Sequence, residues 1–150
     1  MTPDEIAGAV AGISDQIPFN HQLGLRVDRF GPDGTLVSFD MRPELVGNFA
    51  TGVLHGGVIS ATLDLVGGLT ALGSVLANAA PTTMDEVGEI FSRFGTIDLR
   101  IDYLRPGSGE RFEARGTTLR AGRRVAVTRM ELHNEAGVLV AVGTGTYITG

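Results

Sequence analysis

The stretch from Gly57 to Asn78 constrains the fold of this chain more than any other feature. It consists of apolar and small residues, and its only charged residue is Asp64. We predict a helix over this stretch that is apolar nearly all round and is therefore buried on most sides. Burying a lone carboxylate among aliphatic side chains costs free energy unless the carboxylate is paired or used. Asp64 is therefore a candidate functional residue.

A membrane span is the rival interpretation of this helix, because it reaches the ~20 apolar residues that a span needs. Two observations argue against it. Asp64 would lie inside the bilayer at a cost of about 2.5 to 3.5 kcal/mol, and the nearest basic residues, Arg42 and Arg93, do not flank the helix. The N-terminus also lacks the basic and apolar segments of a signal peptide. We therefore expect a soluble cytoplasmic protein without membrane contact.

The composition excludes several kinds of site. A length of 150 residues fits a single domain over residues 1–150. The chain has no cysteine, so disulfides, thiolate metal sites and cysteine nucleophiles are excluded. Its 3 histidines are spread along the chain, and we expect neither a metal nor another cofactor. The net charge of -5 argues against nucleic-acid binding, but it is compatible with a small anionic ligand beside a local group of arginines.

The remaining sequence predicts one further helix and six strands. A capping residue, a proline and two acids at residues 2–5 are typical of a helix start, so a helix is expected over 3–15, followed by a connector over 18–21. Alternating apolar residues between turn signals predict strands over residues 23–30, 35–41, 97–103, 111–120, 124–133 and 138–148. The first two strands form a hairpin, and the last four form a meander.

This order of elements is an α+β plan with one antiparallel sheet. A curved sheet wrapped around the long helix would bury most of it, and a second subunit would bury the rest. We therefore expect a dimer or a tetramer. Two segments are predicted as loops, residues 42–54 and 79–94. The second loop is acidic, includes a short helical turn near 85–94, and is a candidate lid or interface element.

His55, Gly56 and Gly57 stand at the start of the long helix, and Asp64 follows His55 by nine residues. Together with the strand end Tyr-Leu-Arg-Pro at residues 103–106, this pattern resembles the hotdog-fold acyl-CoA thioesterases. Within them it is most similar to the phenylacetate-pathway branch of the 4-hydroxybenzoyl-CoA thioesterase superfamily.

The resemblance implies a fold, a reaction and an assembly. Residues 18–148 would form the hotdog core, an antiparallel sheet wrapped around a long central helix, with residues 1–17 as an added N-terminal helix. The enzyme would hydrolyse the thioester of an acyl- or aryl-CoA to the free acid and CoA without a cofactor. Its active sites would be shared between the subunits of a homodimer or homotetramer.

The resemblance also implies catalytic roles for five residues. The backbone N–H of Gly56 would polarise the thioester carbonyl at the amino end of the helix. Asp64 of the opposite subunit would act either as general base on a water or as a direct nucleophile. His55 and Asn48 would orient the thioester or close the loop, and the hydroxyl of Thr96 would help to hold the attacking water. Asn48 precedes His55 by seven residues, where close relatives have six.

Further residues are candidates for binding the substrate. The acyl chain would lie along the helix beyond Gly57, against Val58, Leu63 and Leu65. Arginine forks suit phosphate oxygens, and three arginines stand at predicted strand ends beside glycines. The candidate contacts for the CoA phosphates are Arg105, Arg123 and Arg124. For the last two, a solvated surface role is an equal alternative.

Two other functions are alternatives for a chain of this kind. A hotdog hydratase or dehydratase needs a catalytic histidine paired with a carboxylate in a different local motif, which this sequence lacks. A non-catalytic acyl-CoA-binding protein would keep the pocket without turnover, but the presence of Asp64 favours an enzyme. Structural roles also stay open: His55 as a capping residue, the two glycines as a tight turn, and Thr96 as an ordinary strand residue. The sequence does not determine the acyl chain length.

Overall fold

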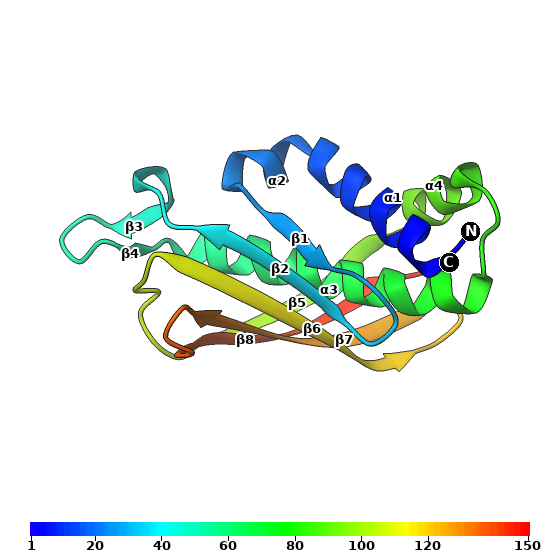
Figure 1. Cartoon of the computed structure of the whole chain (residues 1–150). Coiled ribbons are helices and arrows are strands. Elements are labelled where there is room, and N and C mark those ends of the chain that lie inside the picture. The colour runs from blue at the N-terminus through cyan, green and yellow to red at the C-terminus, as the bar shows by residue number, and fades with distance from the viewer.

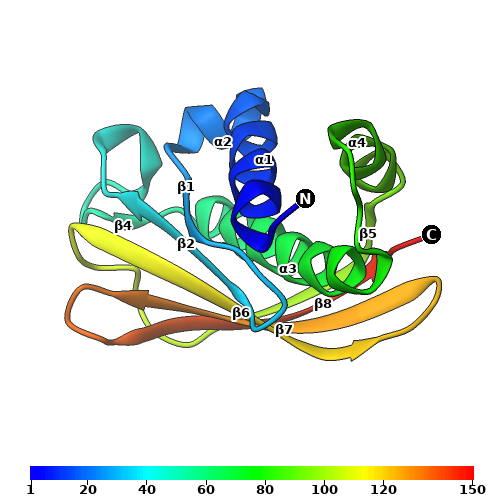
Figure 2. The same ribbon diagram turned by 45° about the vertical axis from the view of Figure 1, so that its right-hand side comes forward.

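The computed structural model describes residues 1–150 and has an antiparallel sheet with helices packed on one face (Figures 1 and 2). This is the predicted α+β architecture with a long central helix. The helices are α1 (Pro3–Gln16), α2 (Pro18–Leu23), α3 (Gly56–Ala79) and α4 (Met84–Ser92), with a 3-10 turn at Pro43–Leu45. The strands are β1 (Arg26–Arg29), β2 (Thr35–Asp40), β3 (Val46–Asn48), β4 (Val53–Leu54), β5 (Gly95–Tyr103), β6 (Arg111–Ala121), β7 (Val125–Asn134) and β8 (Leu139–Ile148).

The main sheet has the strand order β1-β2-β6-β7-β8-β5, and every neighbouring pair is antiparallel. The predicted hairpin of β1 and β2 is confirmed. The predicted four-stranded meander is wrong, because only β6, β7 and β8 follow one another across the sheet. β5 lies at the far edge beside β8, while β2 takes the place next to β6. The chain crosses the sheet as α3 and re-enters it at the opposite edge.

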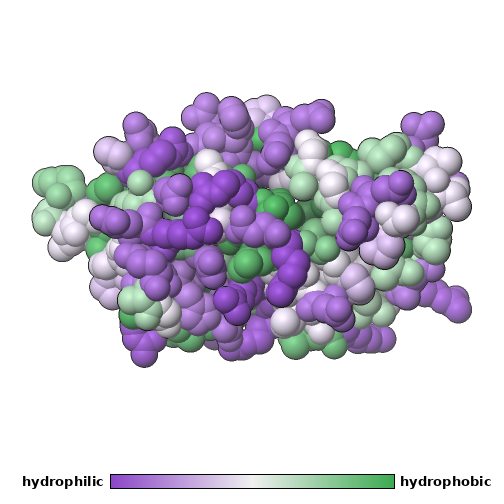
Figure 3. Space-filling model, viewed as in Figure 1, coloured by the Kyte–Doolittle hydropathy of each residue, from purple (hydrophilic) through white to green (hydrophobic).

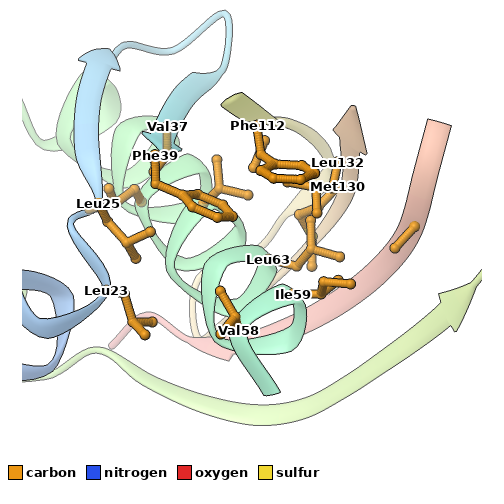
Figure 4. Close-up of a cluster of buried hydrophobic side chains, with 14 of the residues drawn as sticks. Leu23, Leu25, Val37, Phe39, Val58, Ile59, Leu63, Phe112, Met130 and Leu132 are labelled. Atoms are coloured by element: carbon orange, nitrogen blue, oxygen red, sulfur yellow. The ribbon is translucent and has the colours of Figure 1, made fainter. Parts of the chain in front are cut away.

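Aliphatic and aromatic side chains fill the space between α3 and the sheet (Figure 4). The rings of Phe39 and Phe112 are stacked with their centroids 5.3 Å apart, and the two residues are cross-strand partners in β2 and β6. Leu63 of α3 packs into the same cluster and is fully buried. α3 comes very close to the sheet at Gly116, where an added Cβ would lie 2.2 Å from the Thr70 hydroxyl oxygen. These contacts fix which side of α3 faces the sheet.

α3 is long and apolar enough to cross a membrane, but in this structure it is packed against the sheet as a core helix. The predicted first helix is present as α1, and its capping box joins Thr2 and Glu5. The predicted connector over 18–21 is wrong, because this segment forms α2. Pro18 begins α2, and Gly24 ends it in the left-handed conformation with φ 67°. A proline at the first position and a left-handed glycine after the last are both ordinary local signals of helix boundaries.

The two predicted loops also contain regular structure. The segment 42–54 forms the hairpin of β3 and β4, which projects from one end of the molecule (Figure 1). Phe49 at its tip is 99% exposed, and apolar surface gathers at this end in the space-filling view (Figure 3). The segment 79–94 contains α4, whose Thr83 caps the helix by accepting a hydrogen bond from the Glu86 amide.

Candidate active site

His55 forms the N-cap of α3 through its side chain and its backbone. Its ring Nδ1 accepts a hydrogen bond of 2.8 Å from the Gly57 amide, so the neutral ring carries its proton on Nε2. Its carbonyl oxygen accepts from the amides of Val58 and Ile59. The N–H of Gly56 alone among these first amides has no acceptor within the chain. A helix start with one free, half-buried N–H is suited to a carbonyl oxygen that gains negative charge.

Tyr103, at the end of β5, lies beside this helix start. Its hydroxyl donates a hydrogen bond of 3.1 Å to the Gly56 carbonyl oxygen. An added Cβ on Gly56 would lie 3.4 Å from the Tyr103 ring. Tyr103 therefore lies against the residue whose amide is free. Sequence reasoning used this tyrosine only as part of the strand end at residues 103–106.

Asp64 lies two turns further along α3 and is held by the other end of β5. The Thr96 hydroxyl donates a hydrogen bond of 2.8 Å to Asp64 Oδ1. Thr96 pairs across the sheet with Tyr147 of β8, and the Tyr147 hydroxyl donates to the backbone oxygen of Asp64 at 3.1 Å. One cross-strand pair therefore binds both the carboxylate and the backbone of the same residue.

Tyr147 was not identified from the sequence, although it is buried and adjoins Asp64. Its hydroxyl lies in a gap that exists because Gly67 and Gly145 have no side chain. An added Cβ on either glycine would lie within 2.4 Å of that oxygen. Burial raises the pKa of Tyr147 well above its ordinary value of 10.0, and the negative charge of Asp64 adds to the rise. The hydroxyl therefore stays a hydrogen-bond donor.

A β-bulge at Ile97 determines that Thr96 faces Asp64. In β5, Thr96 pairs with Tyr147 and Asp98 pairs with the next residue of β8, so Ile97 has no partner of its own. In a regular strand Thr96 would point to the same face as Asp98, away from α3. The extra residue reverses this orientation, as bulges near functional sites often do.

An apolar cavity of about 180 Å³ opens beside Asp64 and Thr96. The α3 side of its wall comes from Leu65, Leu69 and Leu72, with Gly68 between them. The opposite side comes from α4 and the segment that follows it, through Phe91 and Phe94. Asp64, Thr96 and Tyr147 are the lining residues that carry polar side-chain groups.

Comparisons with known proteins identify the family of this chain. The model of the family described as the thioesterase superfamily matches residues 51–141, a range that includes the α3 start, Asp64 and Thr96. The chain belongs to the thioesterase superfamily. It is a hydrolase of thioesters, and its sheet around a central helix is the hotdog fold of that superfamily.

Individual relatives cover nearly the whole of this thioesterase. An Escherichia coli protein named medium/long-chain acyl-CoA thioesterase YigI is 48% identical over 134 residues, which are 89% of this chain and 86% of that protein. The crystal structure of a Shewanella oneidensis protein related to the thioesterase superfamily is 48% identical, with a TM-score of 0.93 and coverage of 99% and 97% of the two chains. The crystal structure of a thioesterase family protein from Silicibacter pomeroyi matches with a TM-score of 0.74 at 22% identity. The match covers 95% of this chain and 96% of that protein, and it supports the fold alone.

The other predicted site residues of this thioesterase lie in the β3–β4 hairpin, in the core and at the cavity. Asn48 lies in the β3–β4 hairpin, where its side-chain oxygen accepts from the Ala50 amide at 3.0 Å and closes the turn. Val58 and Leu63 face the core and are 7% and 0% exposed. A ligand could not lie against Leu63 without displacing core side chains. Leu65 lines the cavity instead.

The three candidate phosphate contacts lie near opposite ends of the sheet. Arg105 follows β5 at the end of the sheet near Gly56, and it donates to the Leu139 carbonyl oxygen at 3.0 Å. Arg123 and Arg124 lie in the turn between β6 and β7, next to the chain end after β8. Their side chains are exposed and have no acceptor within the chain. One copy of the chain does not bring the three arginines together.

Proposed function

We propose that this thioesterase hydrolyses medium- or long-chain acyl-CoA to a fatty acid and CoA. The observation that carries the proposal is Asp64, which lines an apolar cavity and whose carboxylate accepts a hydrogen bond from Thr96. A carboxylate beside an apolar cavity suits the hydrolysis of an ester whose acyl part is a hydrocarbon chain. The name of the Escherichia coli relative, which is 48% identical, supports the same substrate class.

In the proposed reaction, Gly56 binds the thioester carbonyl and Asp64 activates the attacking group. The free N–H of Gly56 and the helix dipole stabilise the negative charge that develops on the thioester oxygen. Asp64 takes a proton from a water that attacks the carbonyl carbon, or attacks that carbon itself. The C–S bond then breaks, and the CoA thiolate takes up a proton and leaves as a thiol. Where Asp64 itself has attacked, water hydrolyses the acyl–aspartate anhydride, so in both routes an oxygen from water ends in the free acid. No cofactor takes part.

A second copy of the chain is needed to complete the site. Gly56 and Asp64 are eight residues apart on one helix, which separates them by about 12 Å. β5 is an edge strand that carries Thr96 at one end and Tyr103 at the other. Antiparallel pairing of β5 with its copy would bring Thr96 and Asp64 of one subunit next to Tyr103 and Gly56 of the other. This geometry supports a homodimer with two shared sites.

The same pairing supports the proposed CoA contacts. Within one subunit, Arg105 lies at the end of the sheet near Gly56, whereas Arg123 and Arg124 lie at the end near Asp64. In the paired arrangement, Arg105 of one subunit and the arginine pair of the other reach the same end of the joined sheet. Their guanidinium groups would then bind phosphates of one CoA.

Thiol release from a series of acyl-CoA substrates tests the proposed function. We expect hydrolysis of medium- and long-chain substrates and a loss of about 10³-fold in kcat for Asp64→Asn, because the general base or nucleophile is removed. The variant keeps the shape of the side chain, and its unfolding transition serves as the control. Near-full activity of Asp64→Asn would exclude the proposed role of this residue. Binding of acyl-CoA with a raised Tm but without cleavage would instead favour a non-catalytic binding protein.

A further inference from the structure

The cavity beside Asp64 has one polar end and an apolar interior. Asp64 and Thr96 form the polar end, and the lining continues along α3 past Gly68 to Leu72. Leu72 is 1% exposed and is the lining residue of α3 that is most distant in sequence from Asp64. A ligand whose reactive group meets Asp64 would therefore direct an apolar part toward Leu72.

α4 contributes Phe91 to the lining of this cavity, and the helix lies near the C-terminal half of α3 (Figure 2). The apolar residues Val87, Ile90, Phe91 and Phe94 recur at helical spacing and are wholly or partly buried, whereas the acidic residues of α4 are exposed. The Glu86 carboxylate accepts a hydrogen bond of 2.7 Å from the Thr82 amide, and Pro81 before it is buried. These contacts anchor the start of α4 and hold its aromatic side chains over the cavity.

Gly68 leaves an open position in the α3 wall. An added Cβ there would lie 3.4 Å from the Tyr147 ring, which is an ordinary contact. A methyl group therefore fits, and a longer side chain at this position would extend into the cavity. The length of the hydrocarbon that the cavity accepts depends on what stands at residue 68.

We propose that this cavity is the acyl-chain site and that Gly68, Leu72 and Phe91 set the preferred chain length. The inference rests on the proposed function and adds the residues that select the substrate. From Asp64 to Leu72 the helix rises about 12 Å, the length of an extended chain of roughly six to ten carbons once the thioester is seated. Medium-chain acyl groups fill the cavity, and each methylene within it improves kcat/KM by roughly fourfold.

Gly68→Met tests the site, because its side chain occupies the cavity and methionine is compatible with a helix. We expect kcat/KM for decanoyl-CoA to fall about 50-fold relative to butyryl-CoA, since roughly three methylenes lose their apolar contacts. Gly8→Met is the matched control, because Gly8 is an exposed glycine of α1 with no atom within 4 Å of an added Cβ, and it keeps the wild-type profile. Parallel profiles for wild type and Gly68→Met, with activity intact, would overturn the inference.

Phe91→Ala gives the opposite change. Removal of the ring extends the cavity under α4, and the chain length with the highest kcat/KM should rise by two or more carbons. Phe19→Ala removes a ring that is 60% exposed on α2 and serves as the control, with no change in profile. A preference unchanged by Phe91→Ala would contradict the assignment of α4 to the acyl site.

Binding measurements separate this inference from the proposed reaction. Calorimetry measures the binding of decanoyl-CoA and of butyryl-CoA to two proteins, the Asp64→Asn variant and the double variant that also carries Gly68→Met. Weaker binding of decanoyl-CoA alone supports the acyl site, even if the wild-type protein cleaves neither substrate and the proposed hydrolysis fails. Equal binding by both proteins overturns the acyl site, even if the wild-type protein hydrolyses acyl-CoA.

Discussion

Asp64 is held at two points by residues that are partners across the sheet. Thr96 binds its carboxylate, and Tyr147 binds its backbone oxygen. The first contact orients the carboxylate that we propose reacts, and the second holds the helical turn that carries it. The glycines at 67 and 145 make room for the Tyr147 hydroxyl, so a side chain at either position would displace the hydroxyl from this contact.

Tyr147→Phe should lower kcat about tenfold while KM changes little, because the ring still lines the cavity but Asp64 is less well positioned. The defect should be the same at every pH below 10.0, because the raised pKa keeps the wild-type hydroxyl protonated there. Steady-state kinetics over a pH series measures both effects. A defect confined to KM would contradict a positioning role.

His55 controls which amides of α3 are free. His55→Ala should lower the free energy of unfolding by about 1 kcal/mol, because the Gly57 amide loses its acceptor. His55→Asn supplies a side-chain oxygen at the same N-cap and should recover most of that loss. Denaturant unfolding of the two variants makes the comparison. If the asparagine variant is as unstable as the alanine variant, the cap is not the source of the stability.

At the scale of elements, β5 connects both halves of the site. Thr96 at its start contacts Asp64, and Tyr103 at its end contacts Gly56. The bulge at Ile97 lets one strand present Thr96, Leu99 and Ile101 toward α3, although strict alternation would turn Thr96 to the other face. The hydrogen bond between Thr96 and Asp64 therefore depends on a single extra residue.

Deletion of Ile97 should convert β5 into a regular strand and leave Thr96 opposite Tyr147. Ile97 is 56% exposed, so its removal leaves no buried cavity. We expect the deletion variant to keep most of its thioesterase activity, whereas Thr96→Val loses the hydrogen bond to Asp64 and most of kcat. Inactivity of the deletion variant with an intact fold would show that the bulge has a role beyond orienting Thr96.

At the scale of the whole molecule, the proposed shared site predicts complementation between two inactive variants. Gly56→Pro removes only the free N–H, because proline fits the first position of a helix and His55 has the extended conformation that precedes proline. Mixing it with Asp64→Asn should give heterodimers with one intact site, and a statistical mixture recovers about a quarter of wild-type activity. Each variant measured alone is the control. A site within one chain would give no recovery, because each chain carries a defect.

The parts of this protein that were predictable from sequence are those set by neighbouring residues. The capping box at Thr2, the turn between β1 and β2, and the long α3 follow from local propensities and apolar spacing. The family resemblance pointed to Gly56 and Asp64 through a short motif. α2 was missed and α4 was predicted only as a short helical turn, because both helices are short.

The sequence by itself determined that one long apolar helix with a single carboxylate must be removed from water, because exposing that much apolar surface costs free energy. Only the tertiary structure decided what surrounds the carboxylate. Pairing of β5 with β8, the bulge at Ile97 and the approach of Tyr147 join residues far apart in the chain. α3 is apolar on every side, so its sequence could not indicate which face meets the sheet and which borders the cavity. That choice comes from packing between distant segments.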